Sequence, residues 1–307
     1  MRPREPLSRV VSLPITGGLA LLAILATAAY WSKRDMSLML VSERAFFAQP
    51  WRLLTSTLLH ADVFHLAFNV YWLWVFGALL EVELGVLRYG CLLLVFAAVS
   101  SSAQFASGVG GIGLSGIGYG LWGFLYAASR RSTRWHDAMD RKTTQLFAAW
   151  FFLCLGLTLL KVWSVANVAH AVGALAGLSS AVVLIPAEPP ARRLPRAAGL
   201  ALLAGLSLAS ALGATRFRPY LNLDKDAGLE AGQSGYRALL AKRYAEGASE
   251  LERAVRLSPG EASLWFNLGI AYHHLQRLPE ARQAYVRAAE LEPQNQTYRQ
   301  AASALPP

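Results

Sequence analysis

The sequence predicts an all-α protein in two parts, a polytopic membrane helical bundle followed by a small soluble α-helical module. Of the 307 residues, 54% are apolar and only 16% are charged, whereas about a quarter of the residues of a soluble domain are charged. Long apolar runs recur up to residue 214, and from about residue 228 Ala, Glu, Arg, Leu and Tyr recur at helical spacing. This pattern disfavours a purely soluble enzyme.

The net charge of +10 fits a membrane protein better than a nucleic-acid-binding protein. A basic excess on so apolar a chain is expected beside lipid headgroups. The sequence has no basic tract with interleaved aromatic residues to support nucleic-acid binding. Cys91 and Cys154 fall inside apolar runs, so we expect buried packing residues rather than a disulfide or a thiolate metal site.

Seven apolar runs are candidates for membrane spans. The first, at residues 13–31, contains no charged residue and approaches the roughly 20 residues that cross a bilayer. Its flanks also resemble a secretory signal, but the later runs favour an uncleaved anchor. The other six are expected at residues 57–80, 89–107, 115–129, 146–163, 167–185 and 197–214.

The fourth run is short and follows a glycine-rich segment that contains Gly108, Gly110, Gly111 and Gly113. Non-helical backbone at membrane depth is tolerated only where protein or a water-filled cavity surrounds it. The segment therefore predicts an internal cavity.

Basic residues near the ends of the runs favour a cytoplasmic N-terminus. With that orientation the inner flanks carry twelve Lys and Arg residues and the outer flanks eight, which follows the positive-inside rule. The second, fourth and sixth spans then enter from the outer side, and seven spans place the C-terminus outside.

Strongly polar residues lie near the start of those three spans. His60, His65 and Asn69 belong to the second, Ser115 to the fourth and His170 to the sixth. Polar groups inside a span are functional candidates by default, although each alone could be a helix-packing hydrogen bond. Because all three spans enter from the same side, these residues are expected at one depth. A serine within hydrogen-bond reach of a histidine there could use the histidine as its base.

Close helix packing is expected next to His170. Gly173 and Gly177 follow it and form a GxxxG pair, which lets another helix approach closely. That approach would bring the histidine against a neighbouring helix.

Together these motifs resemble the rhomboid intramembrane serine proteases. The resemblance covers roughly residues 14–186, in the order and spacing of the family, and a run at 197–214 looks like an added seventh span. The matching elements are Trp51-Arg52, His60, His65 and Asn69, Phe76-Gly77 with Glu81, Gly113 to Gly116, Tyr119, and Ala169 to Gly177.

The resemblance implies a Ser-His dyad. Ser115 would attack the scissile carbonyl, and His170 would take its proton and return it to the leaving amine. His65, Asn69 and the Ser115 backbone N–H would hold the oxyanion, a role that also suits a helix N-terminus. Tyr119 would pack against His170 and orient it in place of an acidic third member. A structural role is implied for Arg52, His60 and Glu81.

The C-terminal part has a 34-residue period. Pro259 and Pro293 are 34 residues apart, and residues 262–295 resemble a tetratricopeptide repeat. The copy at 228–261 matches less well, and residues 296–306 could supply a capping helix. Two repeats are fewer than the three or so that independent stability usually needs, so the module could depend on a protein partner, on itself or on the membrane domain.

We therefore predict a six-span catalytic domain at residues 1–186, a seventh span and linker at 187–227, and a repeat module at 228–307. The expected function is that of an intramembrane serine endopeptidase of the bacterial inner membrane. Its substrates would be transmembrane segments of other proteins, with a protein or peptide partner at repeats outside the cytoplasm. No metal or organic cofactor is implied.

Two alternatives belong to other classes. A proteolytically silent rhomboid-like scaffold would bind partners through its repeats, but it would have no chemical need for both Ser115 and His170. A membrane metalloenzyme would use His60, His65 and His170 as ligands, but no HExxH motif or inward acid accompanies them.

Overall fold

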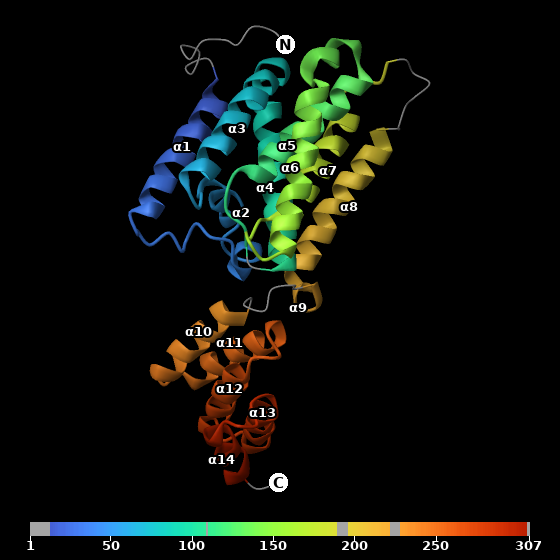
Figure 1. Ribbon diagram of the computed structural model, residues 1–307. Coiled ribbons are helices and arrows are strands. Elements are labelled where there is room, and N and C mark those ends of the chain that lie inside the picture. Colours follow the sequence, from blue (N-terminus) through green and yellow to red (C-terminus); the bar gives the residue numbers. More distant parts are fainter. Residues whose placement is uncertain (1–12, 109, 189–195, 222–227, 306–307) are drawn as a thin grey trace. The chain divides into compact units, whose positions relative to one another are not determined.

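The computed structural model describes residues 13–108, 110–188, 196–221 and 228–305. Every regular element in these ranges is a helix, as the sequence predicts (Figure 1). The contacts divide the chain into two compact units, Met1–Phe217 and Arg218–Pro307. The three-part division proposed from the sequence stays a prediction.

Six helices of the first unit are long and apolar enough to cross a membrane, so this is an integral membrane protein. They are α1 (Pro14–Trp31), α3 (Val63–Leu84), α4 (Val86–Ser107), α6 (Arg141–Leu159), α7 (Asn167–Leu184) and α8 (Arg196–Thr215). A further helix, α5 (Ser115–Arg131), has only 17 residues and corresponds to the short fourth run. The connections contain η2 (Glu43–Phe46), α2 (Arg52–Thr55), η3 (Ser56–Leu58) and η4 (Thr133–Ala138).

The second span begins later than the sequence predicts. The apolar run starts at residue 57, but η3 ends at Leu58 and α3 begins at Val63. Asp62 caps α3, because its carboxylate accepts the backbone N–H of His65 at 2.9 Å. His60 therefore lies in the connection before α3 and not within the span.

Glu81 caps α1 from the far end of α3. Its buried carboxylate accepts the backbone N–H groups of Ile15 and Thr16, each at 2.8 Å. A carboxylate is favoured at a helix N-terminus, where N–H groups have no acceptor in their own helix. Glu81 thus has the structural role expected from the sequence.

Arg52 also has a structural role. Its buried guanidinium donates to the backbone carbonyls of Ser37 and Leu40 at 2.8 and 2.9 Å. These bonds fix the connection between α1 and α2.

The helices α5 and α7 pack backbone to backbone. A Cβ added to Gly173 or Gly177 would clash with the carbonyl oxygens of Gly116 and Gly120, respectively. The GxxxG pair of α7 therefore makes the close approach predicted for it, and the partner is α5.

The last long helix, α8, packs on α4 and α7. A Cβ on Gly199 would lie 2.9 Å from Val182 Cγ1 and 3.1 Å from the Ser179 carbonyl oxygen. The apolar run at 197–214 is thus a seventh long helix of the bundle.

The prediction for Cys91 is wrong. Cys91 is exposed on α4, whereas Cys154 is buried as expected. A membrane helix is apolar on its outer face as well as its packed face, so an apolar run does not show which residues are buried. Six of the basic residues counted on the predicted flanks lie outside the described residues: Arg2, Arg4, Arg9, Arg192, Arg193 and Lys225.

The second unit consists of short helices. After α9 (Arg218–Leu221), α10 (Leu229–Leu240) pairs with α11 (Tyr244–Leu257), and α12 (Ala262–His274) pairs with α13 (Leu278–Leu291). The final helix, α14 (Gln296–Ala304), packs on α13 and lies where a capping helix is predicted.

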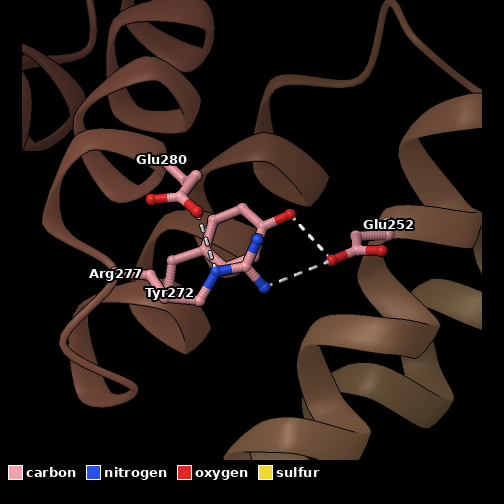
Figure 2. A network of polar contacts seen from close by, with 4 residues as sticks. All are labelled: Glu252, Tyr272, Arg277 and Glu280. Carbon is pink, nitrogen blue, oxygen red and sulfur yellow. Dashed lines mark hydrogen bonds and ion pairs between the residues drawn. The ribbon is translucent and has the colours of Figure 1, made fainter.

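A polar network joins the two helix pairs of this unit (Figure 2). The Tyr272 hydroxyl on α12 donates to the Glu252 carboxylate on α11 at 2.8 Å. The Arg277 guanidinium lies over the Tyr272 ring, 4.3 Å from its centroid, and donates to Glu280 at 2.9 Å. Burial, together with the bond to Glu252, raises the pKa of Tyr272 to about 12, so the hydroxyl stays protonated and acts as the donor.

Candidate active site

A small cavity lies where the glycine-rich segment meets α5. Its volume is about 10 Å³, which is room for about one water molecule. The cavity predicted from the glycines is therefore present, and Ser115 lies in its wall. The lining residues are Thr57, Ser100, Ser101, Gln104, Gly111, Ile112, Gly113, Ser115, Gly116, Ala166 and Ala169.

Ser115 is the first residue of α5 and is half-buried. The first N–H groups of a helix have no acceptor in that helix, and the helix dipole is positive at this end. Developing negative charge beside the Ser115 backbone N–H is therefore favoured.

His60 holds the backbone that leads into α5. Its Nε2 accepts the Leu114 N–H at 3.3 Å, and its Nδ1 lies 3.1 Å from the Leu58 carbonyl oxygen. These partners assign the proton to Nδ1, which donates to Leu58. The buried His60 thus has the structural role expected from the sequence.

The three-histidine metal site finds no support in the geometry. Both ring nitrogens of His60 already have backbone partners. Within the described ranges, the His, Cys, Asp and Glu side chains form no group of three or more that could hold a metal ion.

His65 approaches the glycine-rich segment from α3. A Cβ on Gly113 would lie 2.6 Å from His65 Nε2, so the imidazole packs directly against Gly113. This close approach and a φ of +103° both require glycine. The His65 Nδ1 accepts the Ala61 N–H at 3.4 Å, which assigns the ring proton to Nε2. An N–H donor therefore lies beside the chain two residues before Ser115.

Asn69 lies one turn further along α3 and is buried. Its side-chain amide donates to the His65 carbonyl at 3.0 Å. Asn69, His65 and His170 are all absent from the residues that line the cavity. The structure therefore brings His65 to the glycine-rich segment and leaves Asn69 one turn behind it.

His170 is 3% exposed and stacks on Tyr119, with ring centroids 4.6 Å apart and an interplanar angle of 23°. The contact predicted between these two residues is therefore present. The buried His170 Nδ1 has no hydrogen-bond partner among the described residues, so no carboxylate of the described chain pairs with it. No hydrogen bond joins the ring to the Ser115 hydroxyl in this structure; such catalytic bonds often form only when substrate is bound.

Gln104 on α4 is a further polar residue of the site, which none of the sequence motifs marks. Its side-chain oxygen accepts the Ala169 N–H at 3.3 Å, and Gln104 lines the cavity. It thereby caps the start of α7 directly before His170. The rule that marks strongly polar residues within a span as candidates could have found this glutamine.

Comparison with known proteins finds one match in each unit. Residues 48–187 match the family model of the Rhomboid domain, and residues 262–295 match that of the Tetratricopeptide repeat. The Rhomboid protease GlpG of Pectobacterium atrosepticum is 34% identical over 135 residues, which cover 42% of this chain and 47% of that protein. The Rhomboid protease GlpG of Yersinia pseudotuberculosis is 31% identical over 137 residues, or 43% and 47% of the two chains.

The chain therefore spans about half the length of the curated relatives that it matches. The matched part holds the cavity, Ser115 and His170, and the second match falls on α12 and α13. The membrane unit thus contains a region that matches the Rhomboid domain, and the second unit contains one that matches the Tetratricopeptide repeat.

Proposed function

We propose that the protein is an intramembrane serine endopeptidase that cleaves transmembrane segments of other membrane proteins with a Ser115–His170 dyad. The observation that carries the proposal is the pairing of α5 and α7, whose glycines hold the helix start of Ser115 against the helix of His170. The rhomboid match and the cavity beside Ser115 support the same conclusion.

In this mechanism the Ser115 hydroxyl attacks the scissile carbonyl as its proton moves to His170. The imidazolium then protonates the leaving amine. Water attacks the acyl-enzyme as His170 takes its proton, and His170 returns that proton to the Ser115 oxygen as the acyl group leaves. The Tyr119 ring stacks on the His170 imidazole. This contact supports a dyad in which Tyr119, in place of the acidic residue of a triad, orients the histidine.

The oxyanion would form at the start of α5. Its donors would be the Ser115 backbone N–H, which lies at the helix start, and the His65 Nε2–H, which packs against Gly113. Asn69 would be the third oxyanion donor after its side chain changes rotamer, because its amide donates to the His65 carbonyl in this structure.

The first test is covalent labelling of the purified full chain with a fluorophosphonate probe. We expect labelling of the native protein and none of Ser115→Ala, with cleavage of a model transmembrane substrate lost in Ser115→Ala and in His170→Ala. Cleavage by Ser115→Ala at the native rate would disprove the mechanism.

The oxyanion role has its own test. Loss of one donor typically costs about 10²–10³-fold in rate, so Asn69→Ala should retain weak cleavage. Turnover that stays intact while only substrate binding weakens would remove Asn69 from the oxyanion site.

We further propose that the N-terminus is cytoplasmic and that the repeats lie on the outer side of a bacterial inner membrane. The six candidate spans and the shorter α5 would together make seven crossings, and an odd number of crossings separates the two ends. Repeats on that side would raise the local concentration of a bound protein near the cavity. A reporter fused after Pro307 should be active only outside the cytoplasm; activity only inside would refute the topology.

A further inference from the structure

The helix α8 lies outside the part of the chain that matches the Rhomboid domain, which ends at residue 187. It packs on α4 and α7, the helices that carry Gln104 and His170. Ser210, Gly213 and Ala214, in its last two turns, are buried. The C-terminal end of α8 is therefore a packed part of the bundle, and the dyad mechanism gives it no role.

Ala214 belongs to a small buried apolar cluster that is separate from the main core of the unit. Three segments far apart in sequence supply its fully buried members: Val41 and Ala45 from the connection between α1 and α2, Phe105 and Ala106 from α4, and Ala214 from α8. Ala214 is 1% exposed. A larger side chain at this position must therefore displace its neighbours.

The same cluster joins the connection between α1 and α2 to α4. The Phe46 ring, at the end of η2, stacks on the Phe105 ring of α4, with centroids 5.7 Å apart and an interplanar angle of 26°. The helix α8 also contacts η2. The end of α8, the connection and the end of α4 thus share one set of apolar contacts.

The cluster also contacts the glycine-rich segment that leads into α5. A Cβ on Gly110 would lie 3.0 Å from Val41 Cβ and 3.7 Å from Phe105 Cδ2, so the backbone at Gly110 packs on two members of the cluster. A close-packed interior has little free volume and transmits a displacement. A shift of Val41 or Phe105 therefore reaches the backbone that leads to Ser115.

Two hydrogen bonds hold the other end of this segment. The Gly113 N–H donates to the Ser56 carbonyl oxygen at 3.4 Å, and the Leu114 N–H donates to His60 Nε2 at 3.3 Å. Both distances exceed the roughly 3.2 Å at which the usual range for N–H donors ends. Packing against the cluster therefore has to supply part of the constraint on the segment.

We propose that Ala214 of α8 is a positioning residue for Ser115, because through the cluster it holds the glycine-rich segment that leads to the start of α5. This inference rests on the proposed function, in which Ser115 is the nucleophile. A displaced cluster moves the segment, and the Ser115 hydroxyl then loses its alignment with His170. The helix α8 is thereby part of the catalytic unit and more than an additional membrane span.

Ala214→Leu tests the proposal from α8. Leucine is larger than alanine by an isopropyl group, so Val41 or Phe105 must move to admit it. The matched control is Ala209→Leu, the same change at an exposed position of the same helix. Valine adds less volume, so Ala214→Val and Ala209→Val give the same comparison if Ala214→Leu does not fold.

The first readout is backbone hydrogen exchange in the full chain in detergent, which does not depend on catalysis. We expect residues 110–116 to exchange on the order of 10-fold faster in Ala214→Leu and at the native rate in Ala209→Leu. Exchange in α1 and α3 should stay native in both variants. Equal exchange of residues 110–116 in the two variants would overturn the proposal. Faster exchange throughout the unit would also overturn it, because it would show only a general loss of stability.

The second readout is the rate at which a small fluorophosphonate labels Ser115. A misplaced nucleophile costs on the order of 10-fold or more in rate, so we expect a loss of that size in Ala214→Leu and none in Ala209→Leu. Slower labelling with native exchange of residues 110–116 would overturn the proposal, since the effect would not pass through the segment. Faster exchange in a protein that the probe never labels would support the role of α8 in holding the segment while refuting the proposed function.

Discussion

The helix α5 contacts α7 through backbone atoms, whereas α6 contacts the bundle mainly through side chains. Gly173 and Gly177 let the backbones of α7 and α5 touch, whereas α6 is held by aromatic rings and two side-chain hydrogen bonds. Backbone contact leaves no side chain that can rotate to absorb a shift. The difference separates a pair of helices in backbone contact, which carries Ser115 and His170, from a helix that the bundle contacts mainly through side chains.

The largest effect is expected from a methyl group placed between α5 and α7. Gly173→Ala should lower the stability by about 3 kcal/mol or more, because the new Cβ meets the Gly116 carbonyl and two backbones must separate. Gly118→Ala is the control on α5, since a Cβ there has no atom within 4 Å. Thermal unfolding in detergent measures both. Equal melting temperatures would contradict the backbone contact.

A smaller effect is expected at α6. Phe147→Leu keeps an apolar side chain but loses ring contacts with Trp72 and Trp122, which together contribute about 2 kcal/mol. Phe152 lies on the same helix and is 68% exposed, so Phe152→Leu should change little. Hydrogen exchange should quicken in α6 and not in α5 or α7. Faster exchange throughout the unit would show that α6 is not a separable element.

A comparison of Gly113, in the segment that leads into α5, with Gly85 distinguishes the cost of backbone strain from that of a steric clash. Gly113 and Gly85 both have positive φ, +103° and +80°, but only at Gly113 would a Cβ meet another group, His65 Nε2 at 2.6 Å. Gly85→Ala should cost about 1 kcal/mol from strain alone. Gly113→Ala should cost roughly 1–2 kcal/mol more and lower cleavage. Equal losses would mean that the His65 contact adds nothing.

The smallest effect lies in the second unit, where water is the solvent. Tyr272→Phe removes the hydroxyl that donates to Glu252 (Figure 2), and we expect a loss of about 1 kcal/mol. The exposed Tyr236 supplies the control, Tyr236→Phe. Chemical denaturation of the full chain, followed by a probe in the repeats, gives the comparison. An unchanged midpoint in Tyr272→Phe would show that the network does not stabilise the contact between the two helix pairs.

Much of the fold was predictable because each span is an uninterrupted apolar run. The run at 167–185 became α7 at Asn167–Leu184, and the run at 197–214 became α8 at Arg196–Thr215. The start of the second span was not predictable from hydropathy, since Leu58, Leu59 and Ala61 precede the helix and are apolar too. The Asp62 cap decides that boundary, and hydropathy does not register a cap.

The candidate site was predictable in part. Ser115, His65 and His170 stand out because a polar residue in a span is costly unless protein surrounds it. Gln104 was equally visible but had no motif around it, and its bond to the Ala169 N–H crosses 65 residues of sequence. The exposure of Cys91 was not predictable, because both faces of a membrane helix are apolar.

The sequence by itself determined the helical class, the order of the spans and the position of the repeat. These properties follow from periodicity and apolar length, which are local or additive along the chain. Only the tertiary structure decided which helix meets the GxxxG pair of α7, which backbone groups His60 and Glu81 hold, and how loosely α6 is attached. Those are contacts between residues far apart in sequence, and their geometry depends on all the helices packing at once.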